Sequence, residues 1–184
     1  MPLTQLDSVA ALIVLDLQKG IVHRSGLPSI GEIVSRSARL AKAFRSHRLP
    51  VALVNVVGAA PGRTDEHRPK FDFTPDWTEL VPELAGEVSD IRVSKQRPGA
   101  FVGTNLRDVL ERRHVTQVFL TGIATSNAVI ATARSAFDYG YNVVFITDAM
   151  MDRDPATHEY FTERVFPRLG ETTTADHVLA RLGQ

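Results

Sequence analysis

An acid, a base and a potential helix N-terminus each follow an apolar run of this sequence. A carboxylate beside an ammonium group can perform general acid–base catalysis, and a helix N-terminus presents backbone N–H groups to an anion. For any one of these residues, a solvated or capping role at a strand end is as reasonable as a catalytic role, whereas several together favour chemistry. The groups are Asp16, Asn55, Lys95, the turn from Thr121-Gly122 to Ala128, and Thr147-Asp148.

The apolar runs before these groups are typical of buried strands, because continuous apolar segments suit a parallel sheet that is covered on both faces. Amphipathic stretches alternate with them, and cap signals predict helices from about Pro28, from Thr104, from Thr125 or Ser126 to Gly140, and from Asp154-Pro155 to before Pro167. The alternation predicts an α/β protein: a three-layer α/β/α fold with a doubly wound, mostly parallel sheet of about five or six strands, in a single domain over residues 1–184. The expected strands are 9–15, 51–57, 90–94, 115–120, 143–146 and 171–173.

In such a sheet the carboxyl ends of the strands meet at one edge, and ligands bind outside that edge. We therefore expect Asp16, Lys95 and Ala128 to surround one pocket. Residues 58–90 are the least regular part of the chain, and a loop of this length is usually functional or part of an interface.

Composition excludes several classes of protein. The chain has 184 residues, with 21 Lys+Arg against 21 Asp+Glu, which argues against nucleic acid or an anionic membrane surface as a partner. No apolar run approaches the ~20 residues of a membrane span, and no export signal is visible, so we expect a cytoplasmic location. The chain contains no cysteine, which excludes disulfides, thiolate metal sites and a cysteine nucleophile.

Missing motifs narrow the function further. There is no P-loop, no G-x-G-x-x-G after the first strand and no G-x-S-x-G elbow. Asp65-Glu66-His67 has a metal-like spacing, but it lies in a Pro/Gly-rich loop without a third ligand nearby, and a solvated loop is the simpler interpretation. His158 is interpreted as a surface or packed histidine of the helix that begins at Asp154-Pro155.

Four segments, taken in order, resemble the motifs of isochorismatase-like hydrolases of the cysteine hydrolase superfamily. Their order and spacing make the resemblance specific, and it extends over roughly residues 9–182. The segments are Ala11–Gln18 (ALIVLDLQ), Lys95–Leu106 (KQRPGAFVGTNL), Thr121–Val129 (TGIATSNAV) and Phe166–Glu171 (FPRLGE).

In that family an Asp, a Lys and a Cys form a catalytic triad, and the turn before the Cys, often with a cis non-proline peptide, supplies an oxyanion hole. The resemblance assigns the Asp to Asp16 and the Lys to Lys95, and it places Ala128 at the position of the nucleophile. It makes Ala124 and Thr125 the oxyanion turn. The candidates for substrate binding are Gln18, Asn55, Arg97, Phe101 and Asn127.

Because Ala128 has no nucleophile, covalent thiol chemistry is excluded at that position. Related subfamilies with a small residue there include true isochorismatases, which cleave an enol ether: an acid protonates the vinyl carbon, an oxocarbenium forms and water adds. Asp16 is the candidate acid, and its pKa depends on whether burial, which raises it, outweighs Lys95, which lowers it. A dianionic substrate would need cations, for which Lys95 and Arg97 are candidates and Arg63 or Arg68 weaker ones.

Two other classes of function remain open. One is a different cysteine-independent hydrolase, in which Asp16 activates water. The other is a non-catalytic relative that binds a small molecule or serves as an assembly module. The presence of both Asp16 and Lys95 in their full motifs favours chemistry.

The resemblance also implies a homodimer or higher homo-oligomer that acts on a small-molecule substrate. Phe71, Phe73 and Trp77 would lie at its interface or else cap the core of their own subunit. No metal and no other cofactor is expected, because the zinc-using nicotinamidases carry Asp-x-His after the second strand, where this chain has Asn55-Val56-Val57-Gly58.

Overall fold

The computed structural model describes residues 3–23, 29–65 and 72–183. Within them, one six-stranded sheet has the order β3-β2-β1-β4-β5-β6, and every neighbouring pair is parallel. The order reverses direction between β1 and β4, so the sheet is doubly wound, as the sequence predicts. The strands are β1 Ala10–Leu15, β2 Val51–Val56, β3 Ile91–Lys95, β4 Gln117–Ile123, β5 Asn142–Met151 and β6 Glu171–Thr173.

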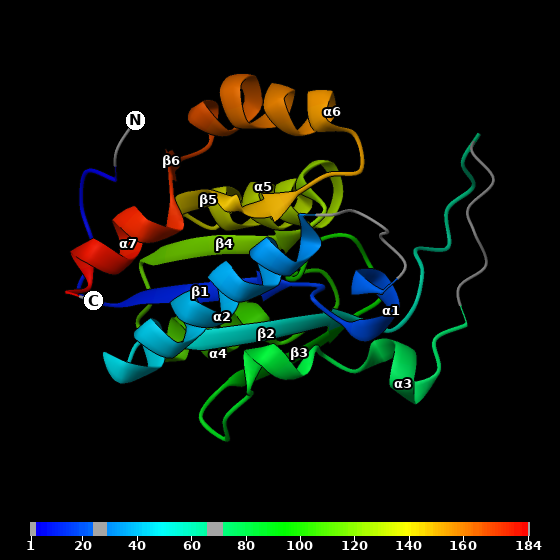
Figure 1. Cartoon of the computed structure of the whole chain (residues 1–184), viewed down its shortest axis with the longest axis horizontal. Coiled ribbons are helices and arrows are strands. Elements are labelled where there is room, and N and C mark those ends of the chain that lie inside the picture. Colours follow the sequence, from blue (N-terminus) through cyan, green and yellow to red (C-terminus); the bar gives the residue numbers. More distant parts are fainter. Residues whose placement is uncertain (1–2, 24–28, 66–71, 184) are drawn as a thin grey trace.

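Helices cover both faces of this sheet and complete the predicted three-layer fold (Figure 1). The helices α2 (Ile30–Ser46) and α7 (Ala175–Arg181) pack on one face, and α4 (Leu106–Arg112) and α5 (Ile130–Asp138) pack on the other. Two short helices, α1 (Lys19–Val22) and α3 (Pro75–Thr78), contact each other beyond the ends of β1 and β2. The helix α6 (Pro155–Tyr160) follows β5.

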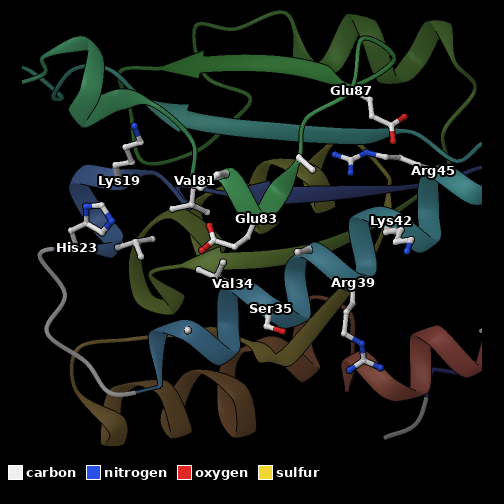
Figure 2. A pocket seen from close by; sticks show the side chains of 15 residues that line it. Lys19, His23, Val34, Ser35, Arg39, Lys42, Arg45, Val81, Glu83 and Glu87 are labelled. Atoms are coloured by element: carbon white, nitrogen blue, oxygen red, sulfur yellow. The ribbon is translucent and has the colours of Figure 1, made fainter.

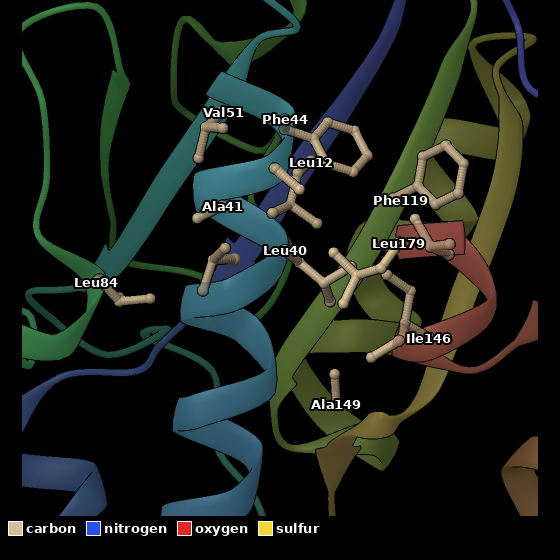
Figure 3. Packing of buried hydrophobic residues seen from close by; sticks show 14 of the residues in the cluster. Leu12, Leu40, Ala41, Phe44, Val51, Leu84, Phe119, Ile146, Ala149 and Leu179 are labelled. Carbon is tan, nitrogen blue, oxygen red and sulfur yellow. The ribbon is translucent and has the colours of Figure 1, made fainter. Parts of the chain in front are cut away.

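The central strand β1 explains the longest apolar run of the sequence. Leu12 and Val14 belong to the core under α2, whereas Ile13 and Leu15 belong to the core under α5. A strand that is buried on both faces needs apolar side chains at every position. Figure 3 shows the α2 side, where Phe44 meets Phe119 edge to face with ring centroids 5.4 Å apart.

The strand β5 is longer than the predicted 143–146. Leu120 of β4 pairs with Phe145, but Gly122 pairs with Met150, so β5 carries a bulge and continues past Thr147-Asp148. The carboxylate of Asp148 accepts a hydrogen bond from Ala175 N and pairs with Arg36. The prediction that Thr147-Asp148 ends a strand at the site is therefore wrong.

The helices predicted from Asp154-Pro155 and from Thr125 both begin there, but only the first has the predicted side-chain cap. Asp154 caps α6 by accepting hydrogen bonds from the backbone N–H groups of Ala156 and Thr157. After β4, however, residues 125–129 form a π-helical turn without a side-chain cap before α5 begins at Ile130. The Thr125 hydroxyl instead contacts Nδ1 of His158.

Residues 58–90, the least regular part of the sequence, contain more secondary structure than the sequence indicates. Thr74 caps α3, and Pro82–Leu84 forms a 3-10 turn. Trp77 is buried and meets Phe73 edge to face at 5.0 Å, so these two aromatics pack within their own chain. Among the other predicted residues, Pro28, Glu66-His67, Arg68 and Phe71 lie outside the described residues. No described helix is both long and apolar enough to span a bilayer.

Candidate active site

Asp16 and Lys95 form a buried ion pair at the carboxyl edge of the sheet. Lys95 Nζ donates a hydrogen bond to Asp16 Oδ2 at 2.7 Å, and the two side chains are 2% and 6% exposed. Asp16 follows the last residue of β1, and Lys95 is the last residue of β3. Strand β2 lies between those strands, so the expected contact joins residues from two non-adjacent strands.

The backbone around Asp16 is unusual. Its φ is 56°, in the left-handed region that a non-glycine residue seldom adopts. On the neighbouring strand β4, Gly122 pairs with Leu15 and has a φ of 113°. A Cβ on Gly122 would lie 2.0 Å from the Leu15 carbonyl oxygen, so only glycine lets the end of β4 come this close to β1. This approach places the turn after β4 beside Asp16.

Burial dominates the titration of Asp16. Removal from water raises the pKa of this carboxyl to about 6, and the charge and hydrogen bond of Lys95 lower it by less. The second oxygen, Asp16 Oδ1, has no hydrogen-bond partner within the described part of the chain. Near neutral pH the carboxyl therefore has accessible protonated and ionised forms, as a general acid or base requires.

The turn after β4 carries the position of the family nucleophile. The Ile123–Ala124 peptide bond is cis, and the Ala124 carbonyl accepts hydrogen bonds from Asn127 N and Val129 N. Ala128 is 1% exposed and belongs to the core on the α5 side of the sheet. A methyl group at this buried position offers no nucleophile, so any chemistry here relies on other groups.

Two residues that the sequence did not assign to the site, His158 and Asp152, hold this turn. His158 Nδ1 lies 2.8 Å from Thr125 Oγ1, and Asp152 Oδ2 accepts a hydrogen bond of 2.8 Å from Ser126 N. Burial lowers the pKa of His158, against the opposing charge of Asp152. His158 is a packed histidine, as interpreted from the sequence, but its contact with Thr125 gave no sequence signal because 33 residues separate the two.

The amides of Gln18 and Asn55 are occupied by the protein itself. Gln18 is fully buried; its Oε1 accepts from Val56 N, and its Nε2 donates to the carbonyls of Val56 and Trp77. Asn55 donates to the Thr78 carbonyl and accepts from the Ser94 hydroxyl. These contacts brace the strand ends and do not support the prediction that either amide binds substrate.

The remaining predicted residues divide between the site and the core. Phe101 is buried, and its ring packs on Tyr139 and Tyr141. Tyr141 directly precedes β5 and so lies at the opposite edge of the sheet. This packing does not support substrate binding by Phe101, which stays a prediction. Arg97 is half-buried, two residues beyond Lys95, and Asn127 is exposed on the turn. Arg63 is exposed in the segment after β2, which extends away from the sheet (Figure 1).

A groove of about 730 Å³ lies elsewhere, between α2 and the 3-10 turn (Figure 2). Several of its charged side chains are paired: Lys19 contacts Asp76 and Glu79, and Arg45 contacts Asp90. Neither Asp16 nor Lys95 lines this groove, so its size alone does not make it the active site. Within the described ranges, no three His, Asp or Glu side chains cluster in a way that could hold a metal ion.

Comparisons with known proteins identify the family and the fold of the chain. The isochorismatase domain model matches residues 10–177. The isochorismatase family protein YwoC of Bacillus subtilis (strain 168) is 37% identical over 179 residues, which cover 94% of this chain and 93% of YwoC. A solved isochorismatase family protein from Burkholderia thailandensis has a TM-score of 0.93 and 37% identity, with coverage of 100% of this chain and 99% of that chain.

An N-carbamoylsarcosine amidase from Thermoplasma acidophilum shares the fold at a TM-score of 0.75 and 28% identity, covering 91% of this chain and 97% of the amidase. The domain match extends over most of the sequence and includes Asp16, Lys95 and the turn with Ala128. The chain therefore belongs to the isochorismatase family and has the fold of its hydrolases, without the nucleophilic cysteine.

Proposed function

We propose that this protein is a hydrolase of a small molecule that works without a covalent intermediate, with Asp16 as general acid–base and Lys95 as its cationic partner. The observation that carries the proposal is the buried Asp16 carboxyl, whose pKa is raised to about 6 and whose Oδ1 has no partner in the described structure. Perturbed carboxyl groups of this kind are common at catalytic sites. The absence of any cysteine in the chain requires a mechanism without a thiol.

The chemistry that fits best is hydrolysis of an enol ether such as isochorismate. Protonated Asp16 would transfer its proton to the terminal vinyl carbon, and the C=C electron pair would form the new C–H bond. Water would add to the resulting oxocarbenium carbon and lose a proton, and the hemiketal would collapse to an alcohol and a ketone. Lys95, 2.7 Å from Asp16, would stabilise the carboxylate left after proton transfer.

Arg97 is the candidate for binding a carboxylate of such a substrate, because it lies half-buried beyond the end of β3. Asn127 and the backbone of Ala124 and Thr125 would contribute polar contacts from the turn. A cytoplasmic location, a homo-oligomeric state and the absence of cofactors remain predictions from the sequence.

The test is a hydrolase screen that includes isochorismate, simpler enol ethers and small amides. We expect the wild-type protein to consume an enol ether and Asp16→Asn to lose that activity. Turnover of amides alone, lost in the same variant, would instead indicate that Asp16 activates water. If Asp16→Asn altered only the melting temperature and no detected activity, the Asp16–Lys95 pair would be structural, and the non-catalytic alternative would replace this proposal.

A further inference from the structure

The turn that follows β4 is held from outside by the segment that follows β5. His158 contacts the Thr125 hydroxyl at 2.8 Å, and Asp152 accepts from Ser126 N at 2.8 Å. Thr125 and Ser126 are consecutive residues, located directly after the cis peptide and before Ala128. The π-helical turn has no side-chain cap of its own, so Asp152 takes the place of one.

The holding segment is itself well anchored. The second oxygen of Asp152 accepts from Arg153 N, which orients the carboxylate. Asp154 caps the first turn of α6 through Ala156 N and Thr157 N, and His158 follows one residue later. His158 is about half-buried, and burial keeps its ring biased toward the neutral form. The capped first turn of α6 therefore positions the His158 ring against the Thr125 hydroxyl.

We propose that His158 is a positioning residue, which acts through the Thr125 hydroxyl and together with Asp152 fixes the 124–128 turn against the end of β1. The contact sets where a substrate on this turn sits relative to Asp16; to that extent it rests on the proposed function. His158 is half-buried, and Thr125 is a fully buried polar residue whose shape, but not its hydroxyl, is kept by Thr125→Val. Loss of the contact should therefore disturb the turn more than the fold.

The pKa of a thiol introduced at the 124–128 turn depends on the geometry of that turn, so it can be measured as a probe without any substrate. The chain has no cysteine, so Ala128→Cys supplies a single thiol whose ionisation can be followed by thiolate absorbance. Lys95 and the start of α5 should hold its pKa below the ordinary value of about 8.5. In this background, His158→Ala and Thr125→Val should each move the thiol pKa upward by about one unit.

Matched variants separate positioning from a general structural role. His158→Asn and Thr125→Ser keep a hydrogen-bonding group and should leave the thiol pKa near that of the parent. His47→Ala is the control, because within the described residues its Nδ1 contacts local groups of α2, the Ala43 carbonyl at 2.9 Å and the Ser46 hydroxyl. If His158→Ala fails to fold, the thiol pKa values of Thr125→Val and Thr125→Ser can be compared instead, because the first variant lacks the hydroxyl and the second retains it.

Activity supplies the second measurement. For whichever substrate the wild-type protein turns over, His158→Ala should lower kcat at least ~10-fold with little change in KM, and His158→Asn should restore most of it. If the wild type turns over nothing, the proposed function fails while the thiol titration still tests the positioning. An ordinary thiol pKa in Ala128→Cys, or one that His158→Ala and Thr125→Val leave unchanged, would overturn the inference.

Discussion

Lys95 at the end of β3 donates a hydrogen bond of 2.7 Å to Asp16 at the end of β1, across the end of the strand that lies between them. Both side chains are almost completely buried. Taking two charges out of water is costly, and the attraction between them offsets that cost only in good geometry. Burial nevertheless prevails at Asp16, whose pKa is raised to about 6. The hydrogen bond from Lys95 therefore fixes the position of the Asp16 carboxyl, while the raised pKa lets that carboxyl exchange a proton near neutral pH.

Asp16→Asn should abolish most of the activity and retain the fold. The amide keeps the shape of the side chain and can still accept from Lys95, but it has no proton to exchange. We expect turnover to fall at least ~10²-fold, with an unchanged circular dichroism spectrum. Asp90→Asn is the matched control, because Asp90 forms another buried pair with Arg45 at 2.8 Å; this variant should lose stability and keep its activity.

The pH dependence of kcat/KM should reveal the role of Asp16. An acid must be protonated, so for enol ether hydrolysis kcat/KM should fall about tenfold per pH unit above the Asp16 pKa of about 6. A general base must be ionised, so kcat/KM would instead rise up to that pH and then level. Steady-state rates between pH 4.5 and 8.5 on the preferred substrate distinguish the two, and a flat profile would contradict both.

Stability should also depend on Asp16, with a defined sign. The unfolded carboxyl ionises near pH 4, whereas the folded one keeps its proton up to about pH 6. Over this interval the folded state binds more protons, so the free energy of unfolding should decrease as pH rises and then stay level. The shift corresponds to a loss of roughly 3 kcal/mol.

Urea unfolding of the wild type and of Asp16→Asn between pH 4 and 7.5 measures this effect. As pH rises to about 6, the unfolding free energy of the wild type should decrease relative to that of Asp16→Asn. A difference that is independent of pH would show that the carboxyl has an ordinary pKa in the folded protein.

Ala128→Cys should fold and gain thiol reactivity. The substitution adds one sulfur atom at a buried position beside the start of α5. Apolar burial raises a thiol pKa, and we expect the helix N-terminus and the charge of Lys95 to outweigh that effect. With Asp16 and Lys95 in place, a weak amidase activity should appear. Val102→Cys, at a position that is 52% exposed, serves as the control thiol. Iodoacetamide should modify the Ala128→Cys variant faster near pH 7; equal or slower modification, with no amide turnover, would refute the prediction.

Gly122→Ala should be the most disruptive single-methyl change near the site. Its Cβ would lie 2.0 Å from the Leu15 carbonyl oxygen, and the φ of 113° is strained for alanine. The end of β4 would have to move away from β1, so thermal stability should fall sharply. Gly31→Ala is the control: it has open space in α2 and should stabilise by about 0.5–1 kcal/mol. Similar melting temperatures for the two variants would contradict this view of the strand ends.

Much of the fold could be predicted from local patterns in the chain. The apolar run of β1 indicates a strand buried on both faces because each of its residues contacts one core or the other. The alternation of strands with amphipathic helices then leads to a doubly wound sheet. The order of the motifs with Asp16, Lys95 and Ala128 identifies the family, since their spacing is carried by the chain itself.

Contacts between distant segments depended on the folded structure. The bulge of β5 comes from its pairing with β4, and the local apolar pattern around residues 143–146 does not encode that pairing. The sequence indicated Gln18 and Phe101 as candidates for substrate binding. In the folded chain, the Gln18 amide is hydrogen-bonded to backbone groups, and Phe101 packs against aromatic rings.

The same holds for the chemistry of the site. The sequence names Asp16 and Lys95, but the balance between desolvation and ion pairing depends on how deeply folding buries them. His158 meets Thr125 only because α6 packs beside the turn after β4. The His158–Thr125 contact joins residues that are 33 positions apart in the sequence, and the Lys95–Asp16 hydrogen bond joins residues that are 79 positions apart. Both depend on tertiary packing, which local sequence patterns do not determine.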